Sequence, residues 1–321
     1  TWNHGLPAPI SGTQGSGFQY LVQGFSVSSN DPASNTQSMI GTSLAIGSGG
    51  ILDLARTHSL TLQTVNYNLP PLSLGSGATL KFRASNGSDS HVVSAPVSVG
   101  GNSTLLISGG NYANEAVLSG ALSGMGNLDL VSESNAASSP AVVRQVTVSS
   151  ANNPFSGNWN VSHTASGDDF AGLRANAANA LGTGTVTLGT RGRLINSAAG
   201  GIDSLSGVVL QGADSKLVLT QPWNNSAATL SLASSSSLVE FAAGTSSIGN
   251  LSGASGSITG TDSASSLVVT QSTDADFSGT LTGSLAFEKS GPATLELSGN
   301  NLHTGETLVS AGTLSGTGSS G

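Results

Sequence analysis

The sequence predicts an all-β protein folded as a single parallel β-helix, that is, a β-solenoid. Three observations support this prediction: short runs of alternating apolar and polar residues, glycine-rich corners between the runs, and a composition unlike that of a compact globular domain. Alternation places the apolar side chains of each run on one face of a strand. Because each run is too short to fold alone, the strands must stack on one another to bury that face.

Composition favours a long repeat domain over ordinary globular domains. The chain has 321 residues, of which 44 are glycine and only 8% are charged. Compact globular domains usually carry about 25% charged residues. Low charge and high glycine also occur in disordered chains, but disordered chains have no reason to keep regular alternation. The alternation therefore favours a repeat fold over disorder.

Charge and cysteine content exclude several classes of function. The formal net charge of -8 and the scattered basic residues argue against nucleic acid as a partner. The absence of cysteine excludes disulfides, thiolate metal ligands and cysteine nucleophiles. No apolar run reaches the roughly 18 residues of a membrane-spanning helix. The opening stretch TWNHGLPAPI lacks the basic and apolar regions of a secretory signal.

Residues 1–38 are the least regular part of the sequence and the richest in aromatic residues, including Trp2, Phe18, Tyr20 and Phe25. A solenoid exposes its core at each end and needs a terminal cap. The sequence therefore predicts an irregular N-terminal cap over residues 1–38. The alternative is a docking segment for another subunit, in which these four aromatic residues would make the contact.

Residues 39–321 form the predicted repeat domain, without an internal boundary. In its first half the apolar pairs are Leu44 and Ile46, Leu52 and Leu54, Leu60 and Leu62, Leu72 and Leu74, Leu80 and Phe82, Val97 and Val99, Leu105 and Ile107, and Leu128 and Leu130. The intervals between successive apolar positions are roughly 20 to 30 residues, which suits one solenoid turn. These positions are Leu52, Leu80, Leu105 and Leu128. The alanine-rich stretch Ala175–Leu181 is expected to form either a helical turn or a loop.

Alternation continues through the second half of the repeat domain. Its apolar positions include Val186 and Leu188, Val208 and Leu210, Leu217 and Leu219, Leu230 and Leu232, Leu238 and Phe241, and Leu267 and Val269. The clearest unit is Ala275–Leu314. Its expected core residues are Leu281, Leu285, Phe287, Leu295, Leu297, Leu308 and Leu314.

Within that unit, five motifs follow in a fixed order. They are Phe277-Ser278-Gly279, Lys289 with Gly291, Thr294 to Asn300, Thr304-Gly305, and Val309 to Leu314. This order resembles the autotransporter-associated β-strand repeat of bacterial autotransporter passengers. The stretches Asn153–Gly157, Ala180–Leu188 and Ile46–Leu62 look like further fragments of such repeats. His303 departs from the pattern because an aromatic residue usually holds its place, and Glu306 falls where small residues are common.

The resemblance implies a right-handed parallel β-helix that is exported and lies outside the cell or on its surface. No series of alternating strands with aromatic girdles, as in a translocator barrel, follows Leu314 in this sequence. We therefore expect the chain to be a passenger, a part of one, or a secreted protein built from passenger repeats.

Many parallel β-helices act on polysaccharides through acidic and basic residues gathered on one face. The best cluster is Asp168-Asp169 with His163 and Arg174. Adjacent residues of a strand point to opposite faces, so at most one of the two aspartates can belong to a site there. A solvated corner is the ordinary interpretation, and the sequence favours a protein that is not an enzyme.

Metal and ice binding have weak support. Asp274 and Asp276 could both face outward and bind calcium, but the glycine-rich nonapeptide repeat of calcium-binding β-rolls is absent. The five histidines show no metal-ligand spacing. Thr-x-Thr elements exist at Thr185 and Thr280 but do not recur at a constant period. The sequence therefore predicts no catalytic residue, no metal site and no cofactor.

Two tryptophans could contact sugar rings. Trp159 lies beside the NPFSG motif and is expected to pack against a neighbouring rung. Trp223 follows Pro222 in a predicted loop, which makes it the better candidate for a glycan contact.

The leading hypothesis is a non-enzymatic structural or adhesive rod whose partner is a second copy of itself. Unpaired terminal rungs would join head to tail into filaments. The alternatives are an adhesin that binds surface glycans through a lateral face and, less favoured, a polysaccharide lyase or hydrolase.

Overall fold

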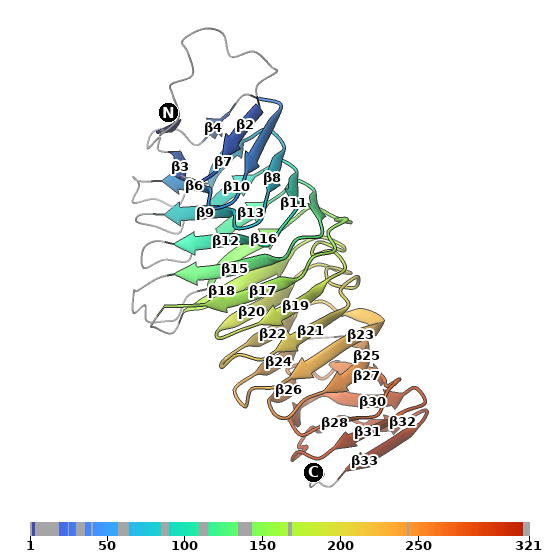
Figure 1. The fold of residues 1–321 in the computed structure, drawn as a ribbon. Coiled ribbons are helices and arrows are strands. Elements are labelled where there is room, and N and C mark those ends of the chain that lie inside the picture. The colour runs from blue at the N-terminus through green and yellow to red at the C-terminus, as the bar shows by residue number, and fades with distance from the viewer. Residues whose placement is uncertain are drawn as a thin grey trace. The chain divides into compact units, whose positions relative to one another are not determined.

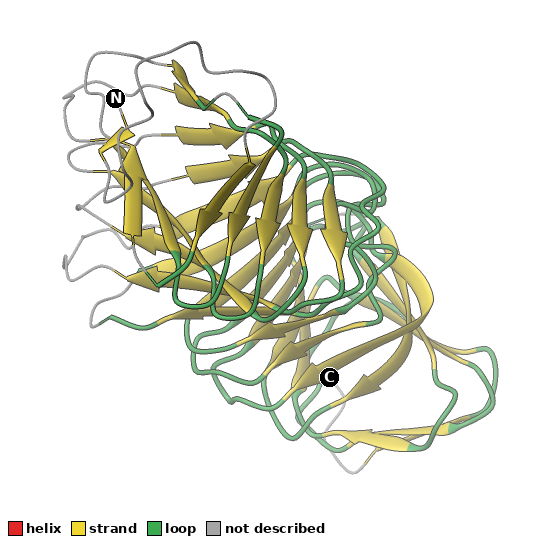
Figure 2. Ribbon diagram, turned by 45° about the horizontal axis from the view of Figure 1, so that its top comes forward, coloured by secondary structure: helices red, strands yellow, loops and turns green. Residues whose placement is uncertain are grey.

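The computed structural model describes residues 2–3, 19–24, 26–29, 36–39, 41–56, 64–84, 90–108, 115–133, 143–165, 169–242 and 244–316. Over these ranges the chain consists of β-strands, turns and loops, and Figure 2 shows no helix there. The strands stack in parallel (Figure 1), so the prediction of an all-β solenoid is confirmed. The chain divides into two compact units, Thr1–Leu173 and Arg174–Gly321.

In the first unit each complete turn contributes one strand to each of three sheets. Sheet A contains β1 (Trp2–Asn3), β3 (Ser26–Ser29), β6 (Ile51–Arg56), β9 (Thr79–Ala84), β12 (Ser103–Ser108), β15 (Leu128–Glu133) and β17 (Trp159–His163). Sheet B contains β2 (Gln19–Val22), β5 (Ser43–Ile46), β8 (Leu72–Leu74), β11 (Val97–Val99) and β14 (Leu122–Gly124). Sheet C contains β4 (Thr36–Ser38), β7 (Thr64–Asn68), β10 (Ser90–Val93), β13 (Glu115–Leu118) and β16 (Val143–Val148).

In the second unit the third strand of the turn is lost over most of the length. Sheet A contains β19 (Thr185–Leu188), β21 (Gly207–Leu210), β23 (Asn224–Leu232), β25 (Thr245–Ser252), β27 (Ser266–Thr270), β30 (Ala286–Ser290) and β32 (Thr307–Val309). Sheet C contains β20 (Gly192–Asn196), β22 (Lys216–Leu219), β24 (Leu238–Phe241), β26 (Ser257–Gly260) and β29 (Thr280–Gly283). Sheet D contains β28 (Ala275–Phe277), β31 (Thr294–Leu297) and β33 (Thr313–Gly316), and β18 (Phe170–Ala175) contains the boundary between the units.

Core residues stack in columns because successive strands pair in parallel and in register. In the first unit Leu52 pairs with Leu80, Leu80 with Leu105, and Leu105 with Leu130, so a turn takes about 25 residues. All four side chains are fully buried. Burying a leucine is worth about 1.5–3 kcal/mol relative to exposing it, so each column stabilises the stack.

The register differs from the sequence prediction at two leucines. Leu105 pairs with Leu130 and not with Leu128, because Leu128 pairs with Ser103, which fills that position of the preceding rung. Leu308 was expected in the core, and this was wrong. It pairs with Glu288 on the outer face and is 47% exposed. Leu60 and Leu62 lie outside the described residues.

The Ala175–Leu181 stretch forms no helix. Beyond the end of β18 its residues form turns, and Ala180 and Leu181 are buried. Of the two expectations for this stretch, the loop is therefore the one observed.

Candidate functional site

The predicted acidic cluster is divided between different environments. Asp169 is buried in an ion pair with Arg144, which is also fully buried. His163 is buried at the end of β17, whereas Arg174 is partly exposed. Asp168 lies outside the described residues. Asp169 therefore belongs to a buried ion pair, in which the attraction between the two charges offsets the cost of removing them from water.

Arg144 was not singled out from the sequence. It interrupts the apolar run Val142–Val148, where an alternating strand has no place for a charged side chain unless it is paired. An arginine within an apolar run, with Asp169 about one turn later, is the signal that could have revealed the pair.

Asp274 and Asp276 are occupied by hydrogen bonds within the repeat. The Thr294 N–H donates to Asp274 Oδ1 at 2.7 Å. The Ser278 and Ser298 hydroxyls donate to the two oxygens of Asp276 at 2.6 and 2.7 Å. Across the described residues, no group of three or more histidines, aspartates or glutamates could hold a metal ion.

Trp223 is fully buried, which corrects the prediction that it could contact a glycan. Its backbone N–H donates to the Ser246 hydroxyl of the next rung at 3.0 Å, so the residue is part of the stack. Trp159 is also fully buried and meets the Phe155 ring edge-on at a centroid distance of 5.6 Å. The expectation that Trp159 packs within the rungs is confirmed, and neither ring is open to a sugar.

The predicted assembly segment is described only in part. Tyr20 lies in β2, where it pairs with Leu44, and its side chain is half-buried. Trp2 lies in β1, which pairs antiparallel with β3 along the edge of sheet A. Phe18 and Phe25 lie outside the described residues. The roles of residues 1–38 as a cap or docking segment remain predictions.

The last repeat contains a buried lysine that acts as a hydrogen-bond donor. The Lys289 ammonium donates to the carbonyls of Ser290, Gly291 and Ala311 at 2.8, 2.9 and 3.0 Å. Its side chain is fully buried, and burial lowers the pKa of Lys289 below its ordinary value. Because Ala311 lies one rung further on, this lysine joins two successive turns through their corners.

Two asparagines play one role in two different repeats. The Asn153 side-chain oxygen accepts a hydrogen bond from the Leu122 N–H at 2.9 Å. The Asn301 side-chain oxygen accepts one from the Leu281 N–H at 3.0 Å. In each case the acceptor replaces a backbone carbonyl of the next rung, so the two stretches are structurally equivalent.

Sheet A of the second unit ends, within the described residues, at β32. Leu308 is 47% and Val309 46% exposed there, whereas Leu295 and Leu297 on β31 are buried. This edge strand therefore presents apolar side chains together with backbone groups that have no partner strand on one side.

The comparison with known families bears on this same region. A family model described as a passenger-associated-transport-repeat matches residues 287–315. Residues 287–315 are a passenger-associated-transport-repeat. This repeat contains Lys289 and Asn301, whose bonds link successive rungs. No curated protein and no solved structure matches the chain.

The passenger-associated-transport-repeat and the β-solenoid together fit an autotransporter passenger domain, as the motif order implied. This repeat family implies a protein that is secreted or displayed on the cell surface. Within the described part of the chain there is no helix with the length and hydropathy needed to cross a membrane.

Proposed function

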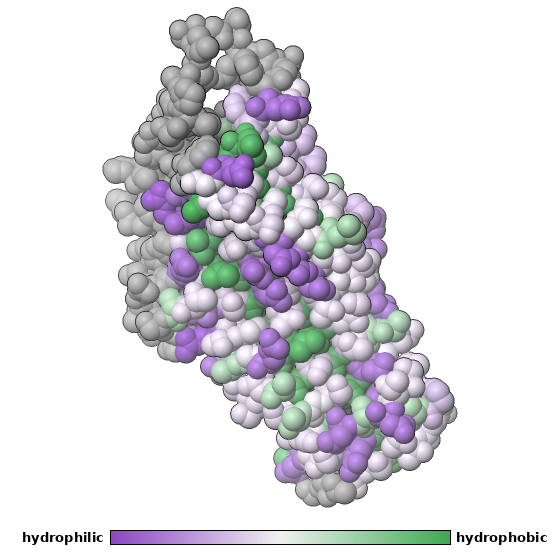
Figure 3. All heavy atoms as spheres, in the orientation of Figure 1, coloured by the Kyte–Doolittle hydropathy of each residue, from purple (hydrophilic) through white to green (hydrophobic). Residues whose placement is uncertain are grey.

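We propose that the chain is a non-enzymatic extracellular β-helix with a structural and adhesive role, which associates end to end with further copies of itself. The passenger-associated-transport-repeat supports the extracellular location. In the view of Figure 3 most of the described surface is pale, with hydrophilic and hydrophobic residues in groups between the pale areas.

The observation that carries the proposal is the edge formed by β32. Edge strands expose rows of backbone N–H and C=O groups that can pair with another chain. At β32 these groups lie beside the exposed Leu308 and Val309. A rung from a second copy would bury Val309, which is in register with the buried Lys289, and would continue the ladder.

End-to-end contact of this kind joins different surfaces of the two copies. Such a contact does not close on itself, so it produces filaments. Residues 1–38 are the proposed opposite surface, with Trp2, Phe18, Tyr20 and Phe25 as the contact residues.

Sedimentation velocity over a range of protein concentrations, with electron microscopy of the same samples, tests the proposal. We expect assemblies that grow with concentration and are suppressed by Val309→Glu. The matched control is Met125→Glu, which adds the same charge at a residue that is 83% exposed in the turn after β14. Deletion of residues 1–38 should also suppress assembly. A protein that stays monomeric at every concentration, or one whose assembly ignores Val309→Glu, contradicts the proposal.

A further inference from the structure

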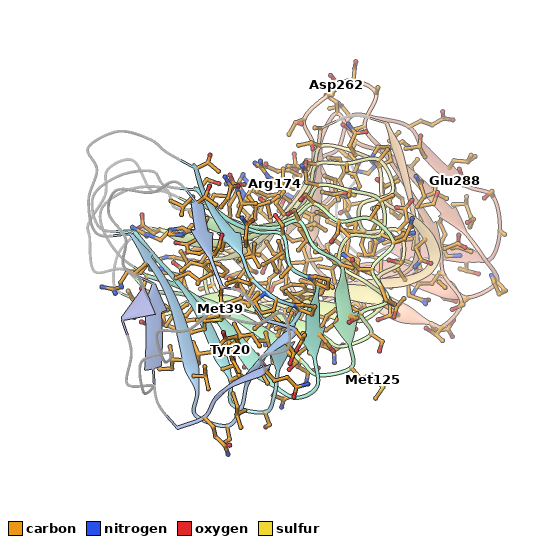
Figure 4. The ribbon with its side chains drawn as sticks, turned by 90° about the horizontal axis from the view of Figure 1, so that it is seen from above. Tyr20, Met39, Met125, Arg174, Asp262 and Glu288 are labelled. Atoms are coloured by element: carbon orange, nitrogen blue, oxygen red, sulfur yellow. The ribbon has the colours of Figure 1, made fainter. Side chains whose placement is uncertain are left out.

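The outer face of sheet C in the second unit carries three cationic side chains on three successive strands. Arg174 lies on β18, Arg193 on β20 and Lys216 on β22. The Ser197 N–H donates to the Ala175 carbonyl at 3.0 Å, which holds the end of β18 beside β20, and Arg193 pairs directly with Lys216. Arg174, labelled in Figure 4, lies at the outer margin of the strands.

An apolar floor lies among these cations. Ile195 pairs with Val218, and both point outward because their neighbours Leu194 and Leu217 point into the core. Ile195 is nevertheless only 7% and Val218 only 9% exposed. Long arginine and lysine stems cover apolar surface while their charged groups stay in water, which accounts for this burial.

Charge at this face is not balanced. The Lys216 ammonium pairs with Glu240 Oε1 at 2.6 Å. This leaves the guanidinium groups of Arg174 and Arg193 without a carboxylate in contact in the described part of the chain. Among the described residues no carboxylate lies within ion-pair distance of Arg174 or Arg193, and the Nε atom of each is buried without a hydrogen-bond partner. Burial lowers the pKa of Arg193 below its ordinary value, Glu240 opposes this shift, and the positive charge of Arg174 adds to it.

A face with three cations and one carboxylate is unusual on a chain whose formal net charge is -8. Guanidinium groups stay charged at every physiological pH, so the repulsion between them cannot be relieved by losing a proton. A bound oxyanion would relieve it, and a carboxylate matches the planar fork of an arginine through two parallel hydrogen bonds.

We propose that this face, formed by Arg174, Arg193 and Lys216 over Ile195 and Val218, binds an acidic polysaccharide through the carboxylates of its uronic acid units. Arg174 lies opposite Ile195 and Arg193 opposite Lys216, so the three cations form an oblique row, and a linear polymer that crosses the strands obliquely meets one cation at each rung.

An acidic peptide is the alternative occupant of this face, and the binding experiment distinguishes the two. Binding at this face is independent of end-to-end association, because the cations lie on a lateral face and not on β32.

Binding of a short oligogalacturonate to the full chain, measured by isothermal titration calorimetry, tests the inference. We expect the double variant Arg174→Gln/Arg193→Gln to bind at least about tenfold more weakly, since it removes both bidentate partners. The matched control is Arg83→Gln/Arg191→Gln, which removes the same charge from arginines that pair with Asp53 and Asp214 and should bind like the unaltered protein. Circular dichroism and the melting temperature verify that each variant is folded.

Glu240→Gln tests the inference through a gain in affinity, which misfolding of the variant would not produce. Removing this carboxylate frees Lys216 and removes repulsion toward the ligand, so binding should become tighter. The methyl-esterified oligogalacturonate, which keeps the sugar rings and loses the charge, should not bind.

Three results would overturn the inference: equal binding by the double variant, equal binding of the methyl ester, or weaker binding after Glu240→Gln. An oligoglutamate that binds at the same face as tightly as the oligogalacturonate would show that the occupant is an acidic peptide instead. Sedimentation of the same variants separates this result from the proposed self-association, which Arg174→Gln/Arg193→Gln should leave unchanged.

Discussion

Single polar side chains decide how successive rungs are joined. Arg144 pairs with Asp169 inside the first unit, and Lys289 satisfies three carbonyls inside the second. Asn153 and Asn301 each accept a backbone N–H from the preceding rung. Buried polar groups are costly unless they find partners, so these residues stabilise one register of the stack over its alternatives.

Replacing Lys289 by methionine should destabilise the second unit. The substitution keeps much of the side-chain volume but removes the hydrogen bonds to Ser290, Gly291 and Ala311. We expect a loss of about 1–3 kcal/mol in the free energy of unfolding, measured by chemical denaturation, because three partly buried carbonyls lose a charged donor. Lys216→Met, which breaks a partly exposed ion pair, should cost no more than about 1 kcal/mol. Equal losses in the two variants would contradict the role assigned to Lys289.

His303 should make stability depend on pH. Burial lowers its pKa below the ordinary value of 6.5, and its Nε2 lies 2.7 Å from the Thr307 hydroxyl. The unfolded chain therefore binds a proton at a higher pH than the folded chain does. The contribution of His303 to the free energy of unfolding is complete above pH 6.5. It falls as the pH drops from there toward the lowered pKa of the folded state.

Replacing His303 by phenylalanine should remove this part of the pH dependence. Thermal unfolding at neutral and mildly acidic pH measures it, and the drop in melting temperature on acidification should be smaller in His303→Phe than in the unaltered protein. His91 and His163 are also buried and remain in both proteins, so the comparison isolates the contribution of His303. An identical drop in both proteins would show that His303 does not contribute.

At the scale of strands and corners, backbone geometry sets the shape of each turn. Alternation gives every strand a buried face, while glycine allows the corners to pass close to the rung before. Gly124, at the end of β14, has a φ of 104°, and a Cβ atom there would overlap the carbonyl oxygen of Val99 in the preceding rung. Only glycine adopts this conformation without strain.

Gly124→Ala should therefore cost about 1–3 kcal/mol in the free energy of unfolding, both from the positive φ and from the overlap with Val99. Gly100→Ala is the matched control in the same sheet region. Its φ is not positive, and the nearest atom to an added Cβ is the Leu74 oxygen at 3.7 Å. The control should stay within about 0.5 kcal/mol of the unaltered protein. Comparable losses at both positions would contradict a geometric requirement at Gly124.

For the whole molecule, the proposed activities differ in how they respond to charge. A chain with a formal net charge of -8 repels its own copies, whereas Arg174 and Arg193 attract a polyanion. Salt shortens the range of both effects. The two proposals therefore predict opposite responses to ionic strength.

Raising the salt concentration from about 50 mM to about 300 mM should promote end-to-end assembly and weaken oligogalacturonate binding, because the Debye length falls below the separation of most charges. Sedimentation and calorimetry on one preparation measure the two responses. Assembly that weakens with salt would show that copies are held by complementary charges and not by the apolar edge at β32.

The sequence by itself determined the fold class, most of the core and the family of the repeat. Alternation is a local property, and the columns that contain Leu52, Leu80 and Leu105 follow from it once strands stack in register. The motif order between Phe277 and Leu314 is also local, which is why it indicated the passenger-associated-transport-repeat that matches residues 287–315.

Only the tertiary structure decided which polar residues are buried and which faces carry charge. Trp223 follows a proline in a predicted loop, yet it is buried because its rung is stacked between others. Leu308 faces outward because the register of its strand places it beside Glu288. Arg144 meets Asp169, and Arg193 meets Lys216, across separations of about one turn. The number of residues per turn changes along the chain, so partners that lie one rung apart cannot be found by counting residues. The stacking of complete turns brings these partners together.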